Sequence, residues 1–187
     1  MNWLAHLRLA PPDPLLRIGN LCGDFVRGVD LAELHPMIRR GVEQHRALDA
    51  FVDAHAVMRR SRRRLQSHRY AGVLVDVCYD HFLARDWHEL GDGRPLREFA
   101  AEVHAQLDAH AALLPPRLRQ ALPFMRAEGW LASYAELDGV DRIFARMSGR
   151  SPRRRPLLQG GELLRRHYAE LGADFAALWP ELLLRVG

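Results

Sequence analysis

Apolar residues in this chain recur at intervals of three and four, the spacing that lines one face of an α-helix. No stretch alternates apolar and polar residues, and no segment repeats, so we predict an all-α fold. A short first helix, which Asn2 could cap, is stopped by the prolines between 11 and 14. Pro36 suits the first turn of a long helix that reaches about Asp53.

The later part of the chain continues this pattern. An Arg-rich amphipathic helix is predicted next, followed by a helix over about 69–85 that is apolar on nearly every face. Glycine and proline at 91–95 indicate a turn, and about 148–161 is predicted to be a flexible Arg-rich loop. A last amphipathic element, 161–183, is expected to bend or end near Pro180. With 187 residues, of which 48% are hydrophobic, the chain can bury one core, so we predict a single-domain helical bundle.

Two of the predicted apolar faces carry ionisable residues. His45 and Asp49 are one helical turn apart on an apolar stripe, so both are expected to point inward. Asp76 and Asp80 repeat this spacing on the most apolar helix. Buried carboxylates protonate, pair or bind a cation, and no arginine lies within these stripes to neutralise them all. Either pair alone is most simply a local hydrogen-bonded pair, but the two together, with Asp24 upstream, lead us to predict a divalent metal centre.

Other ionisable residues lie close to these pairs in the sequence. Asp53 extends the edge formed by the first pair, whereas His55 would leave that face if the helix continued. One of the two is therefore expected to contact the metal ligands rather than the metal itself. His81 lies about a quarter turn from Asp80 and is expected to line the pocket. Oxygen-rich ligation with some imidazole suits Mn²⁺, Mg²⁺ or Fe²⁺, and leaves open whether one or two ions bind.

Charge and composition reduce the number of functional classes that the sequence allows. All 27 lysine and arginine positions are arginine, which excludes a phosphate-binding loop lysine, a Schiff base and a lysine general base. Six arginines lie between 58 and 69, and four lie between 148 and 156. Each group is either a solvated face or a surface that binds an acidic protein or a phosphate. Nucleic acid is disfavoured because interleaved aromatic residues are missing. The two cysteines, Cys22 and Cys78, do not have the spacing of a thiolate metal site. No segment is long enough to cross a membrane or has the features of a secretory leader, so we expect a cytoplasmic protein.

Four sequence blocks also resemble a known family. They read MNWLAHLRLA, GNLCGDFVRG, GVEQHRALDAFVDAH and DVCYDHFLARDW, and in this order they closely resemble the acyl carrier protein phosphodiesterase family. The blocks cover about the first half of the chain, and the later WLASY and FARMSGR stretches resemble the family's weaker C-terminal pattern. This resemblance implies an all-α fold related to HD-domain phosphohydrolases and dependence on a divalent metal, with Mn²⁺ favoured. It also implies removal of 4′-phosphopantetheine from holo-acyl carrier protein.

The resemblance and the chemistry of phosphodiester hydrolysis together suggest roles for particular residues. The matched positions that we expect to bind the metal are His6, Asp24, His45, Asp49 and Asp80. Candidates to orient the attacking water are Asp53 and Asp76, and candidates to protonate the leaving serine oxygen are His55 and His81. The chain departs from the family pattern at Arg8, where a second histidine is expected, and at VDAHA, which replaces the usual TDSHP.

The implied partner is small and strongly acidic. The arginines that directly follow the helix of His45 and Asp49 are expected to dock it, and they are Arg59, Arg60, Arg62, Arg63 and Arg64. Three alternatives remain open from the sequence: a metal-dependent phosphohydrolase acting on nucleotides, an Arg-rich nucleic-acid-binding module, and a helical scaffold without catalysis.

Overall fold

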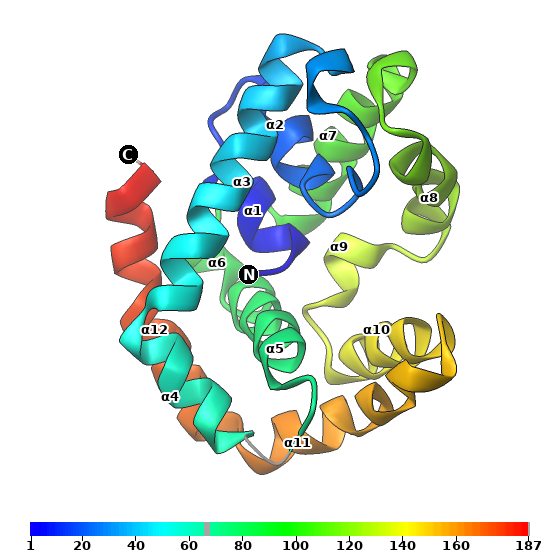
Figure 1. Ribbon diagram of the computed structural model, residues 1–187. Helices are drawn as coiled ribbons and strands as arrows, with labels where there is room; N and C mark the ends of the chain where they lie inside the picture. Colours follow the sequence, from blue (N-terminus) through cyan, green and yellow to red (C-terminus); the bar gives the residue numbers. More distant parts are fainter. Residues whose placement is uncertain (66–67, 187) are drawn as a thin grey trace.

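The computed structural model describes residues 1–65 and 68–186, and Figure 1 shows that they form helices joined by short connections. No strand occurs in these residues, so the predicted all-α fold class is confirmed. The α-helices are α1 (Trp3–Leu9), α2 (Pro14–Cys22), α3 (Pro36–Ala54), α4 (Ala56–Arg64), α5 (Ala71–Arg85), α6 (Trp87–Leu90), α7 (Leu96–Ala109), α8 (Pro116–Ala127), α9 (Trp130–Ser133), α10 (Leu137–Gly149), α11 (Gly160–Arg166) and α12 (Tyr168–Val186). Three short 3₁₀ helices are η1 (Leu31–Glu33), η2 (Ala111–Leu113) and η3 (Pro152–Gln159).

Helix α5 forms the centre of the molecule. From Leu74 to Ala84 every residue except Asp76 is buried, because the helix is apolar on nearly all sides. It contacts α1, α4, α10 and α12, which surround it in Figure 1. Asp80 therefore lies in the interior on the most enclosed helix of the fold, whereas Asp76, one turn earlier, is partly exposed.

Helices α2 and α3 cross so closely that their backbones touch. A methyl group on Gly19 would lie 2.2 Å from the carbonyl oxygen of Ile38, and one on Gly41 would lie 2.4 Å from that of Leu16. Only glycine leaves room for this approach. The crossing lies about one turn before His45 on α3, so it fixes the position of that side chain relative to the end of α2.

The N-terminus of α1 is capped by a residue far away in the sequence. Asp80 accepts hydrogen bonds from the backbone amides of Leu4, at 2.7 Å, and Ala5, at 3.2 Å. The expected cap by Asn2 is wrong, since its side chain instead donates to the hydroxyl of Tyr134 at 2.8 Å. A buried carboxylate at this end of a helix satisfies amides that have no partner within the helix.

Two other expectations about segments need correction. The segment predicted as a loop at 148–161 is helical for most of its length, because α10 continues to Gly149 and η3 occupies 152–159. Of the two expectations at Pro180, a bend or an end, the end is wrong, because α12 includes this proline and continues to Val186. Among the residues that the structure describes, no helix has the length and apolar character needed to cross a bilayer.

Candidate metal centre

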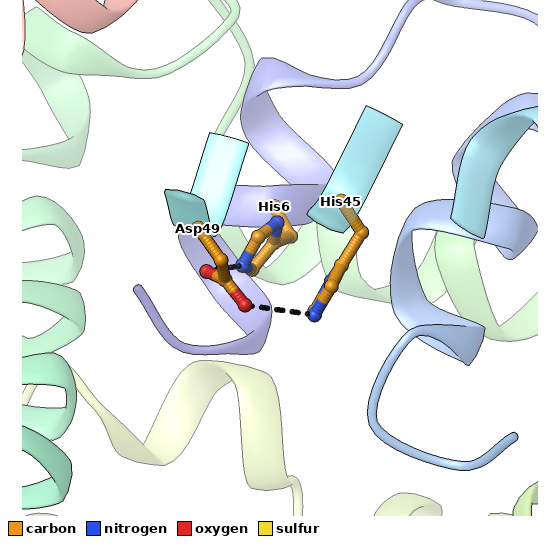
Figure 2. Close-up of side chains that lie close together, drawn as sticks. All are labelled: His6, His45 and Asp49. Atoms are coloured by element: carbon orange, nitrogen blue, oxygen red, sulfur yellow. Dashed lines mark hydrogen bonds and ion pairs between the residues drawn. The ribbon is translucent and has the colours of Figure 1, made fainter. Parts of the chain in front are cut away.

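Three of the five predicted metal ligands converge at one point. His6 comes from α1, and His45 and Asp49 come from consecutive turns of α3 (Figure 2). The Asp49 carboxylate lies 3.1 Å from Nε2 of His6 through Oδ1 and 3.1 Å from Nε2 of His45 through Oδ2. Potential ligand atoms of all three residues lie within 4.8 Å of one another, the separation expected of groups that share one ion.

A backbone carbonyl on α2 fixes the orientation of the His45 ring. Its Nδ1 donates to the backbone carbonyl of Asn20 at 2.8 Å, since a carbonyl oxygen can only accept. The Nε2 atom then faces Asp49 Oδ2 and, at 4.0 Å, Asp24 Oδ1. In a neutral ring this Nε2 is an acceptor, and acceptors that face each other repel unless a proton or cation lies between them. Gly23 packs against the ring so closely that a methyl group there would lie 2.3 Å from its carbon atoms.

His6 is fully buried and stacks on His45, with ring centroids 3.8 Å apart. Burial lowers the pKa of His6 to about 4, although its contact with Asp49 opposes this shift. Its ring is therefore neutral at pH 7, the form that binds metals. Burial alone would raise the pKa of Asp49, but the close contacts with the His45 and His6 rings and the nearby α-ammonium group of Met1 hold that pKa below the usual value.

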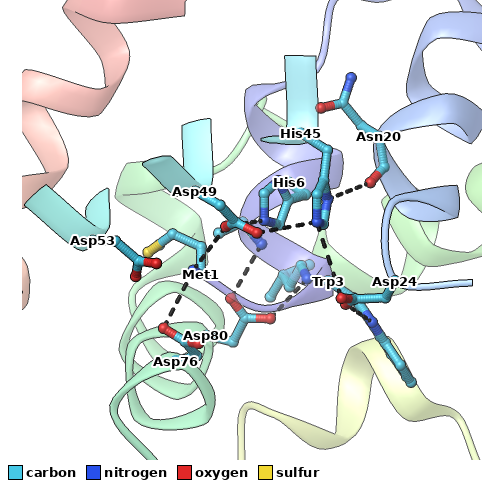
Figure 3. A network of polar contacts seen from close by, with 12 residues as sticks. Met1, Trp3, His6, Asn20, Asp24, His45, Asp49, Asp53, Asp76 and Asp80 are labelled. Carbon is cyan, nitrogen blue, oxygen red and sulfur yellow. Dashed lines mark hydrogen bonds and ion pairs between the residues drawn. The ribbon is translucent and has the colours of Figure 1, made fainter. Parts of the chain in front are cut away.

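Two more carboxylates surround the cluster (Figure 3). Asp24 is 48% exposed, and its Oδ2 accepts a hydrogen bond from the indole of Trp3 at 2.8 Å, which leaves Oδ1 facing His45. Asp76 lies on α5, 3.2 Å from the α-ammonium group of Met1, and burial is the main cause that raises its pKa. The same ammonium group lies 3.4 Å from Asp49, so positive charge already gathers among these acids.

The cluster meets a cavity of about 500 Å³ through Asp49, whereas His6 and His45 are not among the residues that line it. Asp24, Asp49 and Asp76 all line it, so a substrate in the cavity would contact the same carboxylates that surround the histidines. Of the four residues predicted to be catalytic, only Asp76 is among those that line this cavity.

Asp80 and His81 are occupied elsewhere. The carboxylate of Asp80 caps α1, as described above, and burial raises its pKa to about 7. His81 contacts the carbonyl oxygen of Tyr134 through Nδ1, at 2.8 Å, and the hydroxyl of Tyr168 through Nε2, at 2.9 Å. The structure thus does not bring Asp80 to the cluster as a ligand, and both ring nitrogens of His81 have partners outside it.

Asp53 and His55 also lie outside the cluster. The exposed carboxylate of Asp53 forms an ion pair with Arg62. His55 caps α4 by accepting the amide of Val57 through Nδ1, and its Nε2 lies 3.1 Å from Glu181. These contacts give His55 a structural use at the junction between α3 and α4.

Most of the arginines predicted to dock a partner form contacts within the chain. Arg60 and Arg64 bind opposite oxygens of the buried Asp174, at 2.6 and 2.9 Å, and Ser61 donates to the same carboxylate at 2.7 Å. Arg62 pairs with Asp53 as described, Arg59 donates to the carbonyl of Ala54, and Arg63 is exposed. Charge reversal at 60 or 64 would therefore test the stability of the fold before it tested docking.

Sequence reasoning missed two residues that position the cluster. Asn20 orients His45 through its backbone carbonyl, and Trp3 orients Asp24 through its indole. Both lie inside the sequence blocks that carry the family resemblance, which is the signal that could have found them.

The imidazoles of His6 and His45 and the carboxylate of Asp49, with the carboxylate of Asp24 at 4.0 Å from His45, form a donor set that fits a divalent ion such as Mn²⁺ or Fe²⁺. His6, His45 and Asp49 would hold it, with Asp24 completing the set. Fold and site together describe a helical protein with a His/Asp cluster beside a charged cavity, an arrangement suited to metal-assisted hydrolysis.

Comparison with known proteins identifies the family. A sequence model described as acyl carrier protein phosphodiesterase matches residues 1–182. The acyl carrier protein phosphodiesterase of Serratia proteamaculans is 34% identical over 185 residues, which cover 98% of this chain and 96% of the relative. Its counterparts in Shigella boydii and Klebsiella pneumoniae are 33% and 34% identical over the same shares. The chain belongs to the acyl carrier protein phosphodiesterase family, which confirms the resemblance seen in the sequence blocks.

A comparison with solved structures found no match. The relation to HD-domain phosphohydrolases therefore stays a prediction from the sequence.

Proposed function

We propose that this protein hydrolyses the phosphodiester that links 4′-phosphopantetheine to a serine of holo-acyl carrier protein, and that a divalent metal, Mn²⁺ in preference to Mg²⁺ or Fe²⁺, is required. The observation that carries the proposal is the convergence of His6 and His45 on Asp49, which lines the cavity, in a chain of this family. Relatives that the chain matches over 98% of its length carry the name of this activity.

The bound ion would supply charge relief at the phosphoryl oxygens and lower the pKa of a coordinated water towards neutrality. The protein's own residues hold and orient the reacting groups. Trp3 and Asn20 fix Asp24 and His45, so these side chains need little rearrangement when substrate enters.

Asp76 is the residue best placed to move protons. It lines the cavity, and burial raises its pKa above the usual value, which favours the acceptance of a proton. In this mechanism an Asp76 oxygen takes a proton from the attacking water. The bond between phosphorus and the serine oxygen then breaks, and the protonated carboxyl returns the proton to that oxygen. The products are apo-acyl carrier protein and 4′-phosphopantetheine.

The test is incubation of holo-acyl carrier protein with the protein and Mn²⁺, followed by mass spectrometry of the carrier. We expect conversion to the apo form and its loss when a chelator is present. Asp49→Asn should abolish conversion, whereas Asp53→Asn, one turn further along α3 and paired with Arg62, should leave it nearly unchanged.

A nucleotide phosphohydrolase is the alternative function. If holo-carrier stays intact while small nucleotide phosphodiesters are cleaved in the presence of Mn²⁺, that alternative replaces the present proposal.

A further inference from the structure

The cavity beside the cluster contains a second group of charged residues. Arg117 from α8, Arg150 directly after α10 and Arg154 from η3 line it together with Asp24 and Asp49. None of the three arginines forms an ion pair or a side-chain hydrogen bond with another described residue. The cavity therefore combines acids that can hold a cation with arginines that lack anions.

The arginines are close enough to affect one another. Burial is the first cause that lowers the pKa of Arg150, and the positive charges of Arg154 and Arg146 lower it further, while Asp24 raises it. Arg146 is neutralised by Glu128, at 2.9 Å, but Arg150 and Arg154 have no such partner in the described part of the chain. Like charges held together in this way are stabilised when an anion binds between them.

The segment that carries Arg154 is held in place by the loop before α5. His68 accepts the amide of Tyr70 through Nδ1, at 3.1 Å, so its Nε2 carries the proton and donates to the carbonyl of Pro156 at 2.8 Å. The hydroxyl of Tyr70 donates to the carbonyl of Arg153, also at 2.8 Å. These two bonds lie on either side of Arg154 in the sequence, so its backbone is fixed next to the cavity before any ligand enters.

We propose that Arg150 and Arg154, assisted by Arg117, bind the anionic phosphodiester group of the substrate beside the metal cluster. This inference rests on the proposed function and adds the residues that recognise the scissile group. Guanidinium groups suit the task because they donate two parallel hydrogen bonds to phosphate oxygens and stay charged at any physiological pH. Val73 and Met147 line the same cavity and provide an apolar surface for the uncharged chain attached to the phosphate.

The test compares two double variants with the same change in charge. Arg150→Gln with Arg154→Gln removes two arginines that line the cavity, and Arg153→Gln with Arg155→Gln removes two arginines of the same segment that do not line it. Steady-state kinetics with holo-acyl carrier protein and calorimetric titration with inorganic phosphate are measured on the Mn²⁺-loaded proteins. The cavity pair should raise KM and the dissociation constant for phosphate by roughly tenfold or more, the usual scale for lost charged hydrogen bonds. The control pair should change both by less than about twofold.

Equal effects of the two pairs would overturn the inference while leaving the proposed function intact. Loss of phosphate binding in the cavity pair alone, from a protein that never cleaves holo-carrier, would support the arginine site and refute the proposed function. Arg117→Gln lies on a separate helix and repeats the test if the cavity pair alters thermal stability. An unchanged Mn²⁺ affinity in all variants is the control for an intact cluster.

Discussion

Asp80 has two candidate roles that a single substitution separates. As the cap of α1 it stabilises the protein whether or not metal is present, whereas as a metal ligand it does so only when the ion is bound. Asp80→Ala would leave the buried amides of Leu4 and Ala5 without an acceptor. Each orphaned amide costs about 1–3 kcal/mol. The cost of burying the carboxylate disappears with it, so we expect a net loss of about 2–4 kcal/mol in the free energy of unfolding.

The assay is urea unfolding of the wild type, Asp80→Ala and Asp24→Ala, each with a chelator and again with excess Mn²⁺. Asp24 is half-exposed and accepts one bond from Trp3, so its removal should cost about 1 kcal/mol or less in chelator. Added Mn²⁺ at about 100 times its dissociation constant should stabilise the wild type by about 2.7 kcal/mol, and Asp24→Ala by less. If Asp80→Ala matches the wild type in chelator and differs only with Mn²⁺, the capping argument is refuted and Asp80 is a ligand.

The same carboxylate gives a pH dependence of known sign. Because burial raises its pKa to about 7, the folded protein binds a proton at Asp80 in the range where the unfolded chain, with a pKa near 3.8, has released it. Stability of the wild type relative to Asp80→Asn should therefore fall as pH rises from about 4 to about 7, by at most about 1.4 kcal/mol per pH unit. Urea curves for both proteins in chelator across this range measure it. A difference that does not vary with pH would contradict the burial argument.

Three further variants test the packing against His45 and the ion pairs of Asp174. Gly23→Ala should displace the ring of His45, because the added methyl group would lie 2.3 Å from it. Calorimetric titration should then show that Mn²⁺ binds at least about tenfold more weakly. An unchanged affinity would mean that Gly23 does not hold the ring in place. Replacing Arg60 and Arg64 together by alanine should cost about 3–5 kcal/mol in urea unfolding, because Asp174 is left charged and only 2% exposed. Asp174→Ala should cost less, since the two guanidinium groups are 45% and 30% exposed and can turn to water; the opposite order would disprove this account.

The sequence predicted those parts of the site that depend on neighbouring turns of one helix. The spacing of His45 and Asp49 indicated that both point inward, and the structure has them in contact. Asp76 and Asp80 have the same spacing, but their roles diverge because a partner 76 residues away, the amide of Leu4, occupies Asp80. No periodicity within α5 contains that information.

The ends of helices were harder to predict than their faces. The boundary between α3 and α4 was predicted within one residue, but histidine is not a common cap, so the sequence did not indicate that the His55 side chain would cap α4. Asn2 is a common cap but donates to Tyr134, because α1 is satisfied by Asp80 instead. For Asn2 a long-range contact outweighed the local preference, whereas His55 caps α4 through the nearby amide of Val57.

The crossing of α2 and α3 has a consequence for how the protein acquires its site. Asn20, His45 and Asp49 come from helices that are adjacent in the sequence, whereas His6 reaches them on a helix anchored by Asp80, 75 residues beyond its partner Ala5. Contacts between neighbouring segments close a short loop and form early in folding, and distant ones form later. We expect His45 and Asp49 to be in place before His6 arrives. Tight Mn²⁺ binding would then appear only as the last long-range contacts close, which makes metal affinity a measure of completed folding.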